Sequence, residues 1–198
     1  MKSIFFILLL SMAACSNQRI EEKVPLSDSI INAKVVTNAS PQQAVVNFLK
    51  WYKANNERIY KIQFIKGGGL DTTTFYRVDF AQADKFIGEL QKSGFLSTSY
   101  TDNLKKYFKE ADEDLAKHPI NDEPPLAFSA DLIMHTQEDL SSKSPDWDDI
   151  LKAKTTVQTL STTKALVQLR SNYFNYDYTL SLVNGNWLID SINPVLIH

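Results

Sequence analysis

Apolar side chains recur every three or four residues in several stretches of the chain, the spacing that places them on one face of a helix. The first stretch begins at Ser40-Pro41, where serine can cap a helix and proline suits its first turn. We expect this helix to end at Asn55-Asn56. Its expected buried positions are Ala44, Val45, Phe48, Leu49 and Tyr52, with Trp51 on the flank of the apolar face.

Two more helices are predicted in the middle of the chain. Asp79 to Gln82 resembles a capping box, and the helix that it opens should stop at Gly94, a residue favoured just past helix C-termini. A third helix is predicted from about Thr98 to Lys117, with charged residues on its solvated faces. Its narrow apolar stripe consists of Leu104, Tyr107, Phe108, Ala111 and Leu115.

Alternation of apolar and polar residues predicts strands before and after these helices. Residues 58–66 and 72–78 should pair as a hairpin around the triple glycine Gly67–Gly69. A phosphate-binding loop would require a helix directly after the glycines, so we interpret them as a turn. The acidic stretch 144–149 lacks the glycine and the bidentate glutamate of a calcium loop, and it should simply lead into the following sheet.

The last fifty residues predict a β-meander. Its strands are expected at Lys152–Leu160, Ala165–Ser171, Asp177–Val183 and Asn186–Ile192. Asn184-Gly185 separates the last two strands and tolerates the positive φ angles that a tight hairpin requires. Together these elements predict an α+β fold, with N-terminal helices packed on one side of a curved antiparallel sheet. Residues 40–198 should form a single domain.

The first fifteen residues, MKSIFFILLLSMAAC, contain one basic residue, an apolar run and small residues before Cys15. The apolar run Ile4–Leu10 has the length of a signal-peptide core and is too short to span a bilayer. The pattern resembles the lipobox of bacterial lipoproteins, in which the cysteine is diacylated on sulfur and acylated at its new N-terminus. The alternatives are a plain secretory signal cleaved near Ala14 or a buried apolar helix.

The lipobox resemblance implies that residues 1–14 are a signal peptide and that residues 15–39 are a lipidated cysteine with a flexible tether. It also implies a protein anchored to a membrane of the bacterial cell envelope through Cys15, and Ser16 fits sorting to the outer membrane. The leaflet stays open. Cys15 is the only cysteine, so no disulfide is expected.

The charges exclude one class of partner. The chain has 21 Lys and Arg against 23 Asp and Glu, with a formal net charge of −2 and no basic cluster. Binding to a phosphate backbone requires such a cluster, so we expect no nucleic-acid partner.

Asp131 and His135 are the best candidates for chemistry. A spacing of four places both on one face of either a strand or a helix. A histidine oriented by a carboxylate can act as a general base or bind metal. The simpler interpretation is a carboxylate that closes a local hydrogen-bond network beside a surface histidine. One such pair is too few ligands for a stable metal site. We therefore predict no catalytic residue, metal or cofactor.

Three stretches carry a resemblance to a family. The helix AVVNFLKWY, the Asp131 segment after a proline-rich loop, and the closing LSLVNGNWLIDSI resemble bacterial lipoproteins with a domain of the nuclear-transport-factor-two-like, cystatin-like superfamily. The resemblance implies a long helix packed into a strongly bent sheet, often with a cone-shaped pocket. Many members of this superfamily are non-enzymatic binding modules, although fold alone does not specify an activity.

The leading hypothesis is a non-catalytic envelope lipoprotein whose domain binds a protein partner or a small apolar ligand. One alternative is a small pocket enzyme, an isomerase, dehydratase or hydrolase that uses general acid–base residues. Another is an inhibitor or immunity protein of the envelope. The candidate pocket residues are Trp51, Tyr52, Tyr107, Asp131 and His135.

Overall fold

A computed structural model describes residues 40–69, 73–138 and 140–195 of the chain. The predicted signal peptide, the lipidation site Cys15 and the tether lie outside the described residues. Across the described ranges, no helix has both the length and the apolar character needed to cross a membrane.

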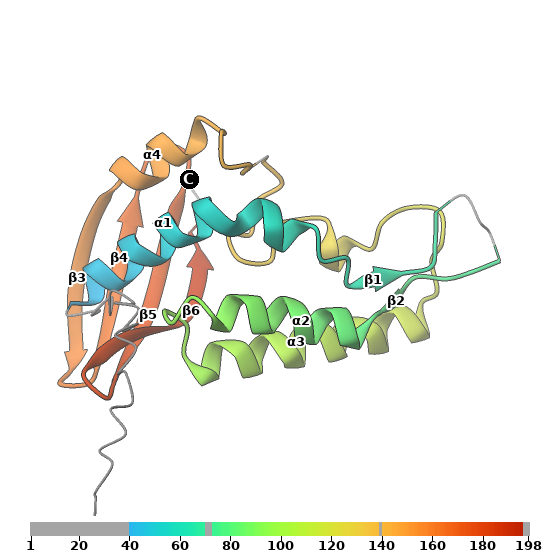
Figure 1. Ribbon diagram of the computed structural model, residues 1–198, viewed down its shortest axis with the longest axis horizontal. Coiled ribbons are helices and arrows are strands. Elements are labelled where there is room, and N and C mark those ends of the chain that lie inside the picture. Colours follow the sequence, from blue (N-terminus) through green and yellow to red (C-terminus); the bar gives the residue numbers. More distant parts are fainter. Residues whose placement is uncertain (1–39, 70–72, 139, 196–198) are drawn as a thin grey trace, which may run out of the picture. The chain divides into compact units, whose positions relative to one another are not determined.

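The described residues form an α+β fold, which confirms the predicted class (Figure 1). In chain order, the elements are α1 (Pro41–Tyr60), β1 (Ile65–Lys66), β2 (Arg77–Val78), α2 (Phe80–Gln91), α3 (Thr98–Lys117), the 3₁₀ helix η1 (Leu126–Phe128), α4 (Asp146–Lys152), β3 (Lys154–Ser161), β4 (Lys164–Arg170), β5 (Asn175–Val183) and β6 (Asn186–Pro194).

The C-terminal strands form a four-stranded antiparallel sheet in the order β3-β4-β5-β6, so the predicted meander is confirmed. The hairpin between β5 and β6 turns at Asn184 and Gly185, whose φ angles are 50° and 79°. Both are positive, as the Asn-Gly pair predicts. Residues 95–97 extend the sheet beyond β6, because the Ile189 backbone exchanges hydrogen bonds of 2.8 and 2.9 Å with Phe95 and Ser97.

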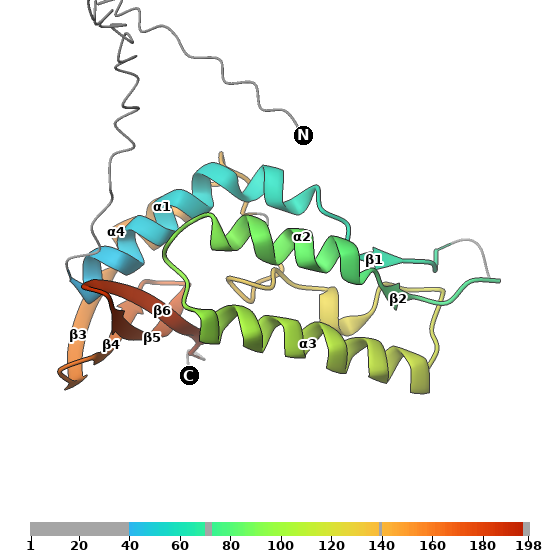
Figure 2. The same cartoon turned by 60° about the horizontal axis from the view of Figure 1, so that its bottom comes forward.

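Helix α1 crosses one face of this sheet (Figure 1). Alternate residues of β4 and β5 are buried, including Val167, Tyr178 and Leu180, and they pack in one core with the apolar face of α1. On α1 the fully buried positions include Phe48 and Leu49. Figure 2 shows α2 and α3 lying side by side between the sheet and the β1–β2 hairpin.

The predicted end of the first helix is wrong, and the strand predicted at 58–66 is confirmed only at Ile65–Lys66. Helix α1 continues to Tyr60 because its apolar face continues: Ile59 lies seven residues after Tyr52 and is fully buried. Asn56 does not stop the helix, since it is buried and its side-chain amide donates to the Leu140 carbonyl.

The predicted hairpin exists but is much shorter than expected. Only Ile65–Lys66 and Arg77–Val78 pair, and they do so in antiparallel register. The glycines that follow β1 have a steric role. A Cβ on Gly67 would lie 2.3 Å from the Phe75 carbonyl oxygen, and a Cβ on Gly68 would lie 2.1 Å from the Tyr76 ring.

The helices in the middle of the chain are confirmed at α2 and α3, with Asp79 and Ser97 as N-caps. Tyr107 departs from its predicted burial, because it is 39% exposed. Helix α4 was missed: the stretch 144–149, predicted as a connection, opens a helix that buries Trp147 completely.

Candidate functional site

The five candidate pocket residues fall into three places. Tyr52 and Asp131 line one pocket together. Tyr107 and His135 line a second, smaller pocket beside the end of β6. Trp51 is half-buried against the core, stacked on Phe48 with ring centroids 6.3 Å apart, and lines none of these pockets. Of the five candidates, the structure therefore places Tyr52 with Asp131 in one pocket and Tyr107 with His135 in another.

Asp131 is held by four hydrogen bonds. Its Oδ2 accepts from the hydroxyls of Tyr52 and Tyr60, each at 2.6 Å. Its Oδ1 accepts from the backbone N–H groups of Ile133 and Met134, at 2.8 and 2.5 Å. An ionised carboxylate offers about four lone-pair sites, so these donors occupy its full accepting capacity.

The segment around Asp131 is a turn, neither the strand nor the helix considered from sequence. The His135 N–H donates to the Asp131 carbonyl at 2.8 Å, and the Asp131 N–H donates to the Thr136 carbonyl at 2.8 Å. His135 has a φ angle of 50°. This left-handed residue closes the turn, and the two tyrosine contacts then fasten the turn to α1.

His135 does not pair with the Asp131 carboxylate through any hydrogen bond recorded among the described residues. Partial burial lowers the pKa of its imidazole, while the charge of Asp131 and the backbone of Ile192 act in the opposite direction. Because the lowering dominates, the ring is neutral at neutral pH. The geometry matches the simpler interpretation, a carboxylate closing a local network beside a partly exposed histidine.

The tyrosines near Asp131 are kept as proton donors. Burial, followed by the charge of Asp131, raises the pKa of Tyr52 well above its ordinary value. The same two causes, in the same order, raise the pKa of Tyr100 and of Tyr176. A phenol that stays protonated can donate a hydrogen bond, so Tyr52 keeps its proton for the contact with the Asp131 carboxylate.

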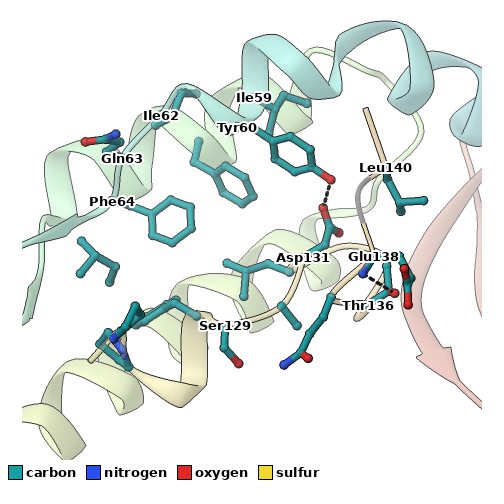
Figure 3. Close-up of a pocket in the computed structure, with 18 of the residues that line it drawn as sticks. Ile59, Tyr60, Ile62, Gln63, Phe64, Ser129, Asp131, Thr136, Glu138 and Leu140 are labelled. Atoms are coloured by element: carbon teal, nitrogen blue, oxygen red, sulfur yellow. Dashed lines mark hydrogen bonds between the residues drawn. The ribbon is translucent and has the colours of Figure 1, made fainter. Parts of the chain in front are cut away.

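The pocket that contains Asp131 has a volume of about 500 Å³ and is called the Asp131 pocket below. It lies between the C-terminal end of α1, the segment leading into β1, the inner side of α2, and the loop 124–140 (Figure 3). One end is rich in aromatic rings: Phe64 lies there with Ile62, Gln63 and Ser129, and it packs against Phe86 and Phe128. The other end contains the polar side chains Tyr60, Asp131, Thr136 and Glu138, with Ile59 and Leu140 beside them.

The aromatic residues of the end that contains Phe64 pack against one another. The Phe64 ring lies 5.1 Å from that of Phe86 and 5.6 Å from that of Phe128, between ring centroids. These rings belong to the segment before β1, to α2 and to η1. The wall is therefore held by three parts of the chain, which makes it a formed surface before any ligand arrives.

Several residues of this pocket were not predicted from sequence. Tyr60 and Phe64 were assigned to a strand, although Tyr60 lies eight residues after Tyr52, a spacing that returns to the same face of a helix. Phe128 and Glu138 carried no periodic signal, because they lie in the loop between α3 and α4. Among the described residues, no group of three or more His, Cys, Asp or Glu side chains is placed to hold a metal.

Comparison with known proteins found no match, whether with family models, with curated proteins or with solved structures.

Proposed function

We propose that this chain is a lipid-anchored lipoprotein of the bacterial cell envelope whose domain binds a small ligand in the Asp131 pocket. We further propose that the domain belongs to the nuclear-transport-factor-two-like, cystatin-like superfamily. The lipobox-like leader ending at Cys15 supports the location. The long helix α1 across the face of an antiparallel sheet supports the superfamily.

One observation carries the binding function: a pocket of about 500 Å³ with an apolar aromatic wall at one end and fixed polar groups at the other. Small-molecule sites are typically about 300–1,000 Å³, mostly apolar, with a few placed polar groups that orient the ligand. Tyr60 at the polar end is 43% exposed, so the site is open to solvent on that side.

The hydrogen bonds of Asp131 favour binding over catalysis. A general base needs a free lone pair within reach of the proton that it removes. Both oxygens of Asp131 already accept two donors each. Using Asp131 as a base would break the contacts that hold its turn against α1.

The test is native mass spectrometry of the protein purified gently from the membranes of its own host. We expect a small mass to be retained. Gln137→Trp places an indole at the pocket from a side chain that makes no hydrogen bond to the described residues, and this variant should lose the retained mass. Gln158→Trp, on the exposed strand β3, is the matched control and should keep it. A wild-type protein that carries no added mass would contradict the proposal.

A further inference from the structure

The charges that line the Asp131 pocket are of one sign. Its lining contains two carboxylates, Asp131 and Glu138, and no Lys, Arg or His. Among the ion pairs recorded for the described residues, none involves either carboxylate. Within the described part of the chain, the pocket lining therefore carries two acidic side chains and no basic one.

The groups that hold Asp131 are all neutral. Its donors are two tyrosine hydroxyls and two backbone N–H groups, which satisfy its lone pairs and leave its charge in place. This half-buried carboxylate is partly removed from water, so its charge is screened less than that of a fully exposed group.

The same donors are unavailable to an anionic ligand. The hydroxyls of Tyr52 and Tyr60 both point to Asp131, as the contact drawn in Figure 3 shows for Tyr60. A carboxylate or phosphate at the polar end would meet two like charges and find these hydroxyls already engaged. The geometry thus disfavours acids as ligands, including fatty acids.

Aromatic side chains add a second attraction for a cation. The Tyr60 ring borders the pocket beside Asp131, whereas Phe64 lies farther from Asp131 and packs against Phe86 and Phe128. An ammonium group over an aromatic face gains electrostatic attraction from the ring quadrupole. The rings farther from Asp131 offer an apolar surface on which a hydrocarbon body can lose its contact with water.

From these observations we infer that the ligand of the Asp131 pocket is an amphipathic organic cation. A protonated amine or quaternary ammonium group lies between Asp131, Glu138 and Tyr60, and an apolar body lies against Phe64 and Phe128. The inference rests on the proposed function, because it names the class of ligand for the same pocket.

The experiment compares three probes that share one phenylbutyl body and differ only in their head group: 4-phenylbutylamine, 4-phenylbutanol and 5-phenylpentanoate. Isothermal titration calorimetry at about pH 7 keeps the amine charged and the acid ionised. The amine should bind about tenfold more tightly than the alcohol, the combined effect of one exposed ionic contact and one cation–π contact. The acid should bind most weakly. Added salt should lower the affinity for the amine and leave the affinity for the alcohol unchanged.

Glu138→Gln tests the charge directly without changing the shape of the side chain. It should lower the affinity for the amine about threefold, a typical effect of one exposed charge, and leave the affinity for the alcohol unchanged. Glu110→Gln on the exposed face of α3 removes an equal charge from a residue outside the pocket lining and should change neither affinity. Glu138 is preferred to Asp131 for this test because replacing Asp131 would also remove hydrogen bonds that hold its turn against α1.

The outcomes separate the two proposals. If the alcohol or the acid binds as tightly as the amine, and Gln137→Trp abolishes that binding, the pocket is a binding site but the inferred charge of its ligand is wrong. If none of the probes binds, the inference is overturned. The retained mass in native mass spectrometry then decides independently whether the pocket holds a ligand of another class.

Discussion

The Tyr52 hydroxyl donates a 2.6 Å hydrogen bond to Oδ2 of Asp131, joining the middle of α1 to a turn 79 residues later in the chain. Tyr60, two helical turns further along α1, donates to the same oxygen at the same distance. The two tyrosines hold the turn in the loop 124–140 against α1, and this loop forms one wall of the Asp131 pocket.

Asp131→Asn should therefore destabilise the fold. The amide nitrogen of asparagine cannot accept hydrogen bonds, so one pair of donors loses its acceptor, at a cost of about 2 kcal/mol for contacts to a charged group. Urea unfolding followed by circular dichroism measures this change. Asp102→Asn, on α3, is the control and should be within about 0.5 kcal/mol of wild type. Equal stability of Asp131→Asn and wild type would show that the four contacts do not fasten the turn.

Two buried tyrosines on β5 should differ in how replacement by phenylalanine changes stability. The Tyr176 hydroxyl donates to the Met134 carbonyl at 2.6 Å, whereas the buried Tyr178 hydroxyl has no partner among the described residues. Tyr176→Phe should lose about 1 kcal/mol of stability. Tyr178→Phe should be neutral or stabilising, because it removes an unsatisfied buried hydroxyl. Thermal unfolding of both variants gives the comparison, and a larger loss at Tyr178 than at Tyr176 would contradict it.

The parts of the fold that could be predicted are those with strong local signals. Helix α3 starts and ends where its stripe and caps predict, and the Asn184-Gly185 hairpin follows from the φ angles that these residues tolerate. The errors have a common cause. The Arg58–Tyr60 stretch alternates like a strand, but the burial of Ile59 keeps it in α1. Local periodicity is ambiguous here, because Ile59 fits both the alternation of a strand and the helical spacing from Tyr52, and tertiary packing decides between the two.

The candidate site was predictable only in part for the same reason. Tyr52 and Asp131 were both nominated, but their contact spans 79 residues of chain and has no local signature. Phe128 and Glu138 enter the pocket because residues 124–138 fold back beneath α1, as Figure 3 shows for Ser129 to Glu138. Nothing in the sequence around them specifies that path.

Lipidation at Cys15 is tested by metabolic labelling with an alkyne-bearing palmitate. The wild-type protein should become labelled and fractionate with membranes, because several acyl chains give a nearly permanent anchor. Cys15→Ala should lose both the label and the membrane association, since the chain contains no other thiol. Ser16→Ala is the matched control and should remain labelled. An unlabelled, soluble wild-type protein would instead support the plain secretory signal.

Stability should fall in acid partly through Asp112. The Arg77 guanidinium, together with the Val78 N–H, holds the pKa of this carboxyl below its ordinary value. A carboxyl with a lowered folded-state pKa stabilises the fold above its unfolded pKa of about 3.9, and the contribution disappears as pH falls through the folded-state pKa.

Asp112→Asn should therefore cost about 1 kcal/mol at neutral pH, a modest value because Arg77 is half exposed. The difference from wild type should shrink as the pH is lowered from about 5 to about 2, since the wild-type carboxyl becomes neutral as well. Urea midpoints across this range measure the difference. A difference that stays constant with pH would mean that the ion pair contributes nothing through its charge.

The two glycines Gly68 and Gly69 provide a matched test of how the β1–β2 connection supports the pocket. Both have positive φ angles, so alanine costs about 1 kcal/mol at either position from backbone strain. At Gly69 a new Cβ meets nothing within 4 Å, whereas at Gly68 it would overlap the ring of Tyr76, which lines the Asp131 pocket. Gly68→Ala should therefore be the more destabilising change by at least about 1 kcal/mol.

Gly68→Ala should also weaken probe binding, because the displaced Tyr76 ring alters the pocket wall, while Gly69→Ala should leave binding intact. Equal effects of the two substitutions on both stability and affinity would show that the position of the Tyr76 ring does not require the absence of a side chain at Gly68.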